Sequence, residues 1–283
     1  MTILVFGRTG QVARELAAHA DVTCLDRSKA NLEQPETCVA AIRTAAPQAV
    51  INAAAYTAVD RAEEEEALAT VTNADAPAAM ARECAILGIP LVSISTDYVF
   101  DGSGETPWVP TDPTRPLGAY GRSKLAGEQG ITQAGGIYGI LRNSWVVSAH
   151  GSNFVRTMRR LGAERDQLAI VADQIGGPTP ARDIAVACLS MARQLAEDAG
   201  KTGIYHFAGE PDVSWAGFAR AIFAELETDC DVMDIPSSEY PTPARRPLNS
   251  RLDCSSLKTV FGIIRPDWRQ GLRDILRDLE NAS

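Results

Sequence analysis

The sequence is poor in the side chains from which metal and disulfide sites are built. Its six cysteines form no C-x-x-C pair, and its three histidines lie far apart, without the spacing of metal ligands. A metal cluster is therefore disfavoured, and we expect the cysteines to be free thiols in a reducing compartment. The sequence also has no G-x-S-x-G segment, which disfavours a hydrolase triad.

Positive charge and long apolar runs are scarce as well. Lys and Arg number 27 against 36 Asp and Glu, so the net charge is −9. This balance disfavours a nucleic-acid-binding surface or an anchor on anionic lipid. No run reaches the roughly 18 apolar residues of a membrane helix, and the first residues lack the basic segment of a signal peptide. We therefore expect a cytoplasmic protein with neither nucleic-acid nor membrane partners.

The first half of the chain alternates short apolar segments with helical segments. The expected strands are Ile3–Phe6, Val22–Leu25, Ala49–Asn52, Leu91–Ser95 and Tyr138–Arg142. The expected helices are Arg14–Ala20, Pro35–Ala45, Glu63–Thr70, Ala74–Leu87 and Ser123–Gln133. This alternation predicts an α/β protein with a Rossmann-type doubly wound parallel sheet, covered by helices on both faces. Side chains that follow the strands should gather at one edge of the sheet, and they include Gly7, Asp26, Ala53 and Thr96.

The pattern becomes less regular after Trp145. Helices are expected at 153–161, 181–198, 214–226 and 270–280, strands at 168–171 and 203–207, and loops at 173–180 and 236–249. We expect residues 1–147 to form a dinucleotide-binding Rossmann domain, to which the chain returns near 181–208. Residues 148–180 and 209–283 should form a smaller C-terminal substrate-binding lobe.

A glycine turn follows the first expected strand and leads into a helix. Gly7 allows a tight turn, Gly10 lets the backbone approach phosphates, and Ala13 is small enough for close helix–strand packing, in the pattern G-x-x-G-x-x-A. Backbone amides and the helix dipole at such a turn favour a pyrophosphate. A plain turn between strand and helix is the alternative, but the position after the first strand favours dinucleotide binding.

A tyrosine and a lysine stand one helical turn apart further along the chain. Tyr120 and Lys124 are four residues apart and so share one helix face, and Thr96 lies 24 residues upstream at the end of an expected strand. Together they indicate a proton-donating tyrosine, a lysine that lowers its pKa, and a hydroxyl that orients a reacting oxygen. The alternative for the pair is a solvated helix face.

Five segments of the sequence match one family of reductases together. They are Gly7–Val12 (G-R-T-G-Q-V), Ile51–Asp60 (I-N-A-A-A-Y-T-A-V-D), Ser95–Gly102 (S-T-D-Y-V-F-D-G), Tyr120–Glu128 (Y-G-R-S-K-L-A-G-E) and Tyr240–Asp253 (Y-P-T-P-A-R-R-P-L-N-S-R-L-D). The chain resembles the dTDP-4-dehydrorhamnose reductases of the extended short-chain dehydrogenase/reductase superfamily, nearly from end to end. The resemblance implies that NAD(P)H reduces the 4-keto group of dTDP-4-dehydro-L-rhamnose to dTDP-L-rhamnose, for cell-surface polysaccharide.

Two alternatives remain open at this point. The chain could reduce another dTDP-4-keto-sugar, because the motifs do not fix the stereochemistry of the product. It could also be a non-catalytic, dinucleotide-binding regulatory subunit, since the β subunit of methionine adenosyltransferase resembles the same family. The complete set of Thr96, Tyr120 and Lys124 favours an enzyme.

The cofactor contacts follow from the strand ends and from the resemblance. Asp26 suits a ribose 2′-hydroxyl and Arg27 suits a 2′-phosphate, so we expect NADPH to be preferred and NADH to be usable. Asn31 and Leu32 stand where the superfamily has an acidic and an apolar residue near the adenine. The expected cofactor-binding residues are Gly7, Thr9, Gly10, Gln11, Val12, Asp26, Arg27, Asn31, Leu32, Ala53, Ala54, Ala55, Tyr120 and Lys124.

The resemblance also implies a substrate site. The residues expected around the sugar are Thr57, Val59, Thr96, Asp97, Tyr98 and Trp145, and those expected at the nucleotide diphosphate are Asn153, Arg245 and Arg246. Core packing is the alternative for Trp145, and a solvated loop is the alternative for the two arginines.

One departure from the family concerns magnesium. Some members dimerise through magnesium held by acidic residues, but Arg182 stands at one of those places here, although Glu15 is retained. A guanidinium cannot ligate magnesium. We therefore expect a monomer or a weak homodimer that does not depend on the metal.

Overall fold

The computed structural model describes residues 1–281 and is built around one six-stranded sheet. Every neighbouring pair in the sheet is parallel, and the strand order is β10-β5-β4-β3-β1-β2. The strands are β1 (Ile3–Phe6), β2 (Val22–Leu25), β3 (Ala49–Asn52), β4 (Leu91–Thr96), β5 (Tyr138–Asn143) and β10 (Gly203–Phe207). The predicted return of residues 203–207 to the main sheet is therefore confirmed.

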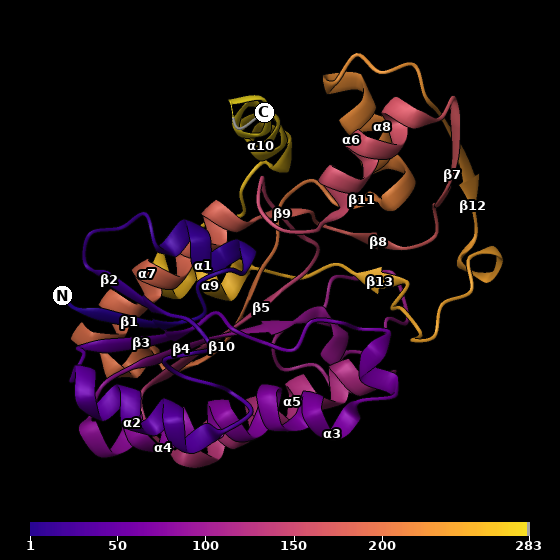
Figure 1. The fold of residues 1–283 in the computed structure, drawn as a ribbon. Helices are drawn as coiled ribbons and strands as arrows, with labels where there is room; N and C mark the ends of the chain where they lie inside the picture. The colour runs from indigo at the N-terminus through magenta and orange to yellow at the C-terminus, as the bar shows by residue number, and fades with distance from the viewer. Residues whose placement is uncertain (282–283) are drawn as a thin grey trace.

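Helices cover both faces of this sheet (Figure 1). One layer holds α2 (Pro35–Ala45), α3 (Glu66–Thr70), α4 (Ala76–Leu87) and α5 (Ala119–Ala134), and the other holds α1 (Gln11–Leu16), α7 (Ala181–Glu197) and α9 (Ser255–Phe261). Ile3 and Val5 pack in one hydrophobic cluster, while Leu4 and Phe6 pack in the other. Strands β1 and β3 are buried along their whole length, which explains their largely apolar sequences, whereas the edge strand β2 is only partly buried. The doubly wound fold is confirmed.

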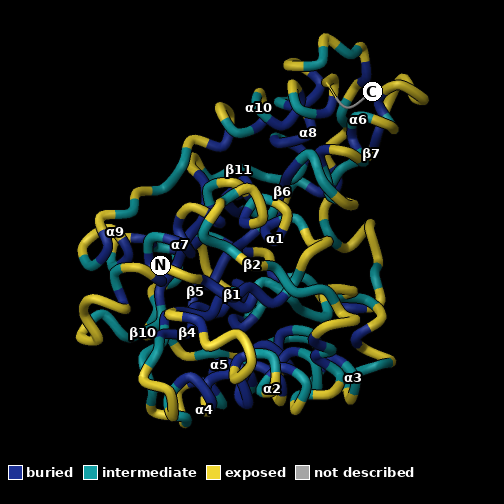
Figure 2. Tube along the Cα trace, turned by 60° about the vertical axis from the view of Figure 1, so that its left-hand side comes forward, coloured by how far each residue is buried: buried dark blue, intermediate teal, exposed yellow. Residues whose placement is uncertain are grey.

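A second group of elements lies beyond the carboxyl ends of the strands (Figure 1). It contains α6 (Phe154–Glu164), α8 (Trp215–Glu225) and α10 (Trp268–Asn281), whose apolar side chains share a separate cluster. Its strands are β6 (Val146–Val147), β7 (Gln167–Val171), β8 (Ile175–Gly176), β9 (Thr179–Pro180), β11 (Val213–Ser214), β12 (Asp231–Ile235) and β13 (Asn249–Ser250). Figure 2 shows the buried residues concentrated in the strands of the main sheet and along the inner sides of the helices.

Two helices do not begin where the sequence predicts. Helix α1 begins at Gln11 rather than Arg14, directly after the extended Gly10, and ends early because the chain turns into β2. Helix α5 begins at Ala119 rather than Ser123. The Ala119 amide donates to the Glu63 carboxylate at 2.9 Å, so a residue far away in the sequence caps this helix. As a result, Tyr120 lies in the first turn of α5.

Four further segments differ from the expectation. A 3-10 turn (Arg61–Glu63), α3 and a π-helical turn (Val71–Asp75) replace the single predicted helix 63–70 and run directly into α4. The predicted loop 173–180 contains β8 and β9. Strand β12 and helix α9 were not predicted. In β12 the cause is composition, because charged residues at positions 231 and 234 interrupt its apolar pattern.

Candidate active site

The predicted strand-end residues lie together at the carboxyl edge of the main sheet. Gly7 and Asp26 follow β1 and β2, Ala53 follows β3, and Thr96 ends β4. A cleft of about 440 Å³ opens there. Its lining includes eight residues that the sequence assigned to the cofactor, namely Gly7, Thr9, Asp26, Arg27, Asn31, Leu32, Ala54 and Ala55.

The two glycines of the turn differ in how much space surrounds them. Gly7 has φ +113°, and an added Cβ would lie 3.3 Å from the main chain of Ala53, so the fold requires glycine there. Gly10 has an ordinary φ of −67°, and its nearest neighbour, Ala53 O, would lie 3.9 Å from an added Cβ. A phosphate seated on this turn gives the reason for glycine at position 10, so the residues present fit a dinucleotide.

The remaining residues of the turn have different environments. Val12 is buried in the core, so only its backbone can face a ligand. The Gln11 side chain points to the segment after β5, since its Oε1 accepts from Ser148 Oγ at 2.8 Å and from Asn153 Nδ2 at 3.0 Å. Asn153 also accepts from the Arg156 amide and thereby caps α6. The first helical turn after the glycines is thus bound directly to the second group of elements.

The two charged residues after β2 are both engaged. Asp26 accepts from the Ser28 amide at 3.0 Å and pairs with Arg8 at 3.5 Å, and the Ser28 hydrogen bonds hold the pKa of the Asp26 carboxyl below its usual value. Arg27 forms an ion pair with Glu33. Arg8 was missed by the sequence reasoning, because the glycine pattern leaves its position unspecified.

Asn31 and Leu32, the two residues expected near the adenine, follow in the same loop. Asn31 closes a local turn, since its Oδ1 accepts from the Glu33 amide at 3.1 Å. Leu32 is buried in the cluster below the sheet, so little of it faces the cleft. An asparagine at position 31 therefore has a role in the backbone of this loop as well as a place in the cleft lining.

Thr96, Tyr120 and Lys124 come together between β4 and α5. The Thr96 hydroxyl lies beside the Tyr120 phenol and acts to lower its pKa, and the Tyr98 ring meets the Tyr120 ring edge to face, with 5.5 Å between centroids. Lys124 is only 5% exposed, and its Nζ donates to the main-chain oxygen of Ile94 at 2.7 Å. Lys124 therefore does not lie on a solvated helix face, and Tyr120 is half-buried.

Burial dominates the protonation of both groups. It raises the pKa of Tyr120 to about 12, against the opposing effect of the Thr96 hydrogen bond. It lowers the pKa of Lys124 to about 8, against the opposing charge of Glu128. The shift at Tyr120 is opposite to the lowering that the sequence predicted, because the phenolate would be desolvated and would be repelled by the negative charge of Asp97.

A buried ion pair supports the strand that carries Thr96. Arg142 on β5 and Glu128 on α5 are both nearly inaccessible and are joined by bonds of 2.9 and 2.6 Å. Ser95 Oγ donates to Glu128 at 2.6 Å. The sequence reasoning gave these residues no role. Because Glu128 lies one turn after Lys124, the pair connects α5 to the ends of two strands.

Asp97 is the other charged group in the cluster. It is 2% exposed, and Thr96 Oγ1 donates to its Oδ1 at 3.1 Å. Burial raises the pKa of Asp97 to about 6, while hydrogen bonds from Ser250 and Thr96 oppose the shift. Ser250 belongs to β13, so the second group of elements approaches Asp97 at the end of β4, and Asp97 Oδ2 is buried there without a hydrogen-bond partner among the described residues.

The residues expected at the substrate are spread around this cluster. Trp145 follows β5, is half-buried, and stacks on Trp215. Thr57 is exposed and Val59 half-buried in the segment after β3. Arg245 is exposed, whereas Arg246 is held by two bonds of 2.8 Å to the Asp60 carboxylate.

The comparisons with known proteins agree with this geometry. The family described as "RmlD substrate binding domain" matches residues 1–281. Relatives called dTDP-4-dehydrorhamnose reductase in Sinorhizobium fredii and Burkholderia thailandensis are 43% and 45% identical, and the alignments cover 98% and 99% of this chain and 97% and 99% of theirs. The chain belongs to the dTDP-4-dehydrorhamnose reductase family.

Solved structures of the family superpose closely. The protein of that name from Clostridium acetobutylicum has a TM-score of 0.93 and 34% identity, covering 99% of this chain and 100% of its own. The one from Bacillus anthracis, in complex with NADP, has a TM-score of 0.90 and 32% identity, covering 98% and 100%. The predicted fold and family are therefore confirmed.

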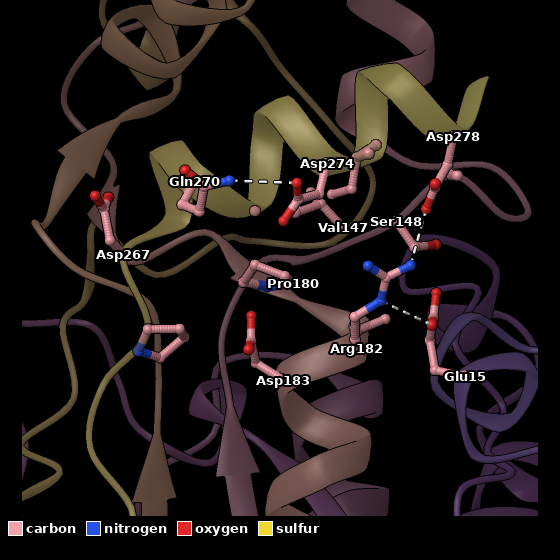
Figure 3. Close-up of a pocket in the computed structure, with 15 residues that line it drawn as sticks. Glu15, Val147, Ser148, Pro180, Arg182, Asp183, Asp267, Gln270, Asp274 and Asp278 are labelled. Carbon is pink, nitrogen blue, oxygen red and sulfur yellow. Dashed lines mark hydrogen bonds and ion pairs between the residues drawn. The ribbon is translucent and has the colours of Figure 1, made fainter. Parts of the chain in front are cut away.

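Arg182 stands where some family members are expected to have an acidic magnesium ligand. It lies at the rim of a separate pocket of about 280 Å³ (Figure 3). Its guanidinium pairs with Glu15 of α1 at 3.5 Å and with Asp278 of α10 at 3.0 Å. Within residues 1–281, no group of three or more His, Cys, Asp and Glu side chains could hold a metal ion. In the same range, no helix has the length and apolar character needed to cross a bilayer.

Proposed function

We propose that this chain reduces the 4-keto group of dTDP-4-dehydro-L-rhamnose to give dTDP-L-rhamnose, with NADPH or NADH as the reductant. The observation that carries the proposal is the placement of Thr96 at the end of β4, next to Tyr120 and buried Lys124 of α5, at the same sheet edge as the glycine turn. Relatives that align over nearly the whole chain carry the name of this reductase. The product would enter the synthesis of cell-surface polysaccharide.

The chemistry assigned to the residues follows from their protonation. A bound reduced nicotinamide supplies the hydride, and the ketone oxygen then becomes an alkoxide that needs a proton. Tyr120 holds its proton at neutral pH because its pKa is raised to about 12, and an alkoxide is basic enough to take it. Thr96 orients the oxygen, and the positive charge of Lys124 favours the phenolate that Tyr120 leaves behind.

The cofactor preference is proposed from the charges after β2. Arg8 and Arg27 line the same cleft as Asp26, and both guanidiniums are well exposed. A 2′-phosphate would be paired by two arginines, whereas a ribose 2′-hydroxyl would need only Asp26. We therefore propose that NADPH is preferred and that NADH is accepted.

For the remaining site residues we propose the same roles that the sequence predicts. Residues 1–147 with 181–208 would hold the dinucleotide, and 148–180 with 209–283 would hold the dTDP-sugar. Thr57, Val59, Asp97, Tyr98 and Trp145 would surround the sugar, and Asn153, Arg245 and Arg246 the diphosphate. The ion pairs of Arg182 support a monomer or weak homodimer that does not depend on magnesium.

One experiment tests the proposed function against its alternatives. The purified chain is mixed with NADPH and dTDP-4-dehydro-L-rhamnose, nicotinamide oxidation is followed by absorbance, and the product is identified by NMR. Formation of dTDP-L-rhamnose is expected. Binding of NADPH without turnover of any dTDP-4-keto-sugar would indicate a regulatory subunit. Turnover of a different dTDP-4-keto-sugar alone would indicate a sister reductase.

A further inference from the structure

Trp145 has a backbone conformation that bulky residues rarely adopt. It lies between β5 and β6, with φ of +47°, in the left-handed region. An L-residue with a large side chain is unfavourable there unless the surrounding structure holds it. The position of the Trp145 indole is therefore imposed by its neighbours, and those neighbours can be identified.

The main neighbour is Trp215, the first residue of α8. The two indole rings are nearly parallel, at 11°, and their centroids are only 3.6 Å apart. Aromatic pairs prefer offset or edge-to-face arrangements with longer centroid distances. Because the two rings overlap almost fully, we infer that the surrounding structure determines their stacked geometry.

Trp215 is itself fixed by a buried amide. Its Nε1 donates to Gln174 Oε1 at 3.2 Å, and Gln174 Nε2 donates to Ser237 Oγ at 2.9 Å. Ser237 is held in turn by the Asp173 carboxylate, which accepts from its amide at 2.9 Å and from its hydroxyl at 2.6 Å. A chain of hydrogen bonds therefore sets the plane of the Trp215 ring.

The Trp145 indole also lies close to residues that neighbour Thr96. A Cβ added at Gly176 would lie 2.9 Å from Trp145 Cε2 and 2.9 Å from Ser250 Cβ, so both side chains meet over this glycine. Ser250 interacts with Asp97, and Asp97 accepts from Thr96. The half-buried indole thus lies a few contacts from the oxygen-binding threonine, with part of its surface accessible.

We propose that Trp215 is a positioning residue that holds the Trp145 indole as a wall of the sugar site, and that Gln174 fixes Trp215 in this task. The inference rests on the proposed function, because the ligand of the wall is the sugar of the dTDP-sugar. A flat aromatic wall complements the C–H face of a hexose. In this proposal Trp215 does not contact the sugar itself and acts only through Trp145. No catalytic motif of the sequence contains Trp215.

The kinetic test compares Trp215→Leu with Trp215→Phe. Loss of the supporting ring should raise KM for dTDP-4-dehydro-L-rhamnose about tenfold, equivalent to about 1.4 kcal/mol, while kcat stays within about twofold. A wall contacts ground state and transition state alike, so its loss appears in KM. Trp215→Phe retains a ring and should stay within about threefold of wild type. KM for NADPH should not change in either variant.

A spectroscopic readout separates positioning from simple loss of stability. Two overlapping indoles produce an exciton couplet in the far-ultraviolet circular dichroism, which Trp145→Phe and Trp215→Phe should each remove. Titration with dTDP-L-rhamnose should change the wild-type couplet, because the sugar packs on Trp145. Gln174→Leu keeps both rings but frees Trp215, so it should weaken the couplet and raise KM in the same direction. It also serves as the second variant if Trp215→Leu does not fold.

Phe261→Leu provides the matched control. Phe261 of α9 packs edge to face on Tyr205, with 5.0 Å between centroids, in the core cluster of the main sheet. Its loss should reduce stability without changing the sugar KM or the couplet. An unchanged KM in folded Trp215→Leu and Gln174→Leu, or a couplet that dTDP-L-rhamnose leaves untouched, overturns the inference. A wild-type protein that shows the couplet response but no turnover overturns the proposed function instead.

Discussion

Arg246 and Asp60 form a fork-to-fork ion pair that joins the proline-rich loop 236–249 to the segment after β3. Two bonds of 2.8 Å connect the guanidinium with the carboxylate, and the Ala244 amide donates to the same carboxylate at 3.1 Å. Such a pair fixes the plane of the guanidinium. Arg246 therefore has a defined orientation, in the position where we propose that it binds the diphosphate, although the sequence reasoning did not assign its partner.

Removing either partner should weaken substrate binding. Arg246→Ala should raise KM for the dTDP-sugar by roughly tenfold to a hundredfold, the range of a charge-assisted hydrogen bond. Asp60→Asn should raise the same KM by a smaller factor, because the guanidinium stays but loses its orientation. Steady-state kinetics with varied dTDP-sugar provide the measurement. If Asp60→Asn lowers KM, Asp60 competes with the substrate for Arg246 and the positioning role is wrong.

Tyr120→Phe should remove the proton donor while leaving the shape of the site intact. We expect kcat to fall about 10²-fold or more, the usual scale of general acid catalysis. NADPH binding, followed by fluorescence titration, should stay close to wild type, since the ring remains against Tyr98. Near-normal turnover would show that another group donates the proton.

The arginines after β1 and β2 should select the cofactor. Arg27→Ala and Arg8→Ala should each raise KM for NADPH far more than KM for NADH, because only NADPH carries the 2′-phosphate. Arg43→Ala is a suitable control, since Arg43 is also an exposed arginine in an ion pair, with Glu83, away from the cleft. Equal changes for both cofactors would leave Asp26 as the selecting residue.

Buried Lys124 should make stability depend on alkaline pH. Burial lowers its pKa in the folded chain to about 8, from the ordinary value of 10.5. Between these values the unfolded chain binds more protons, so stability rises with pH in that window. From about pH 7 to about pH 9.5, the wild type should gain roughly 2 kcal/mol of unfolding free energy relative to Lys124→Met. Urea unfolding at the two pH values measures this difference, and parallel changes would contradict it.

Chelation should have no effect on this chain. Arg182 places a guanidinium between Glu15 and Asp278, where a cation would otherwise be attracted. Activity and molecular mass should be the same before and after treatment with EDTA, by kinetic assay and light scattering. A dimer that dissociates on chelation, or activity that only magnesium restores, would show that other carboxylates bind the metal.

The sequence predicted the parts of this protein that depend on neighbours along the chain. Strands β1, β2 and β3 begin and end as expected, and β1 and β3 are short, largely apolar segments buried along their whole length. Thr96, Tyr120 and Lys124 could be grouped because the end of a strand and one helical turn bring them together. Fold and catalytic cluster are thus largely encoded locally.

The missed features depend on contacts between distant segments. The start of α5 is set by Glu63, and the orientation of Arg246 by Asp60, and neither partner lies near in sequence. Trp145 and Trp215 belong to different elements of the chain, so no local pattern could pair them. The pKa of Tyr120 was misjudged for the same reason, because its burial comes from tertiary packing.

The two glycines of the turn after β1 differ in what the fold demands of them. Folding itself requires Gly7, with its φ of +113°, whether or not a ligand is present. Folding does not require Gly10, and alanine there would even restrict the unfolded chain. If Gly10 seats the pyrophosphate, as we propose, a search for stabilising substitutions on ligand-free protein would accept alanine at position 10 and lose cofactor affinity unnoticed. Engineering of this turn needs the dinucleotide present during selection.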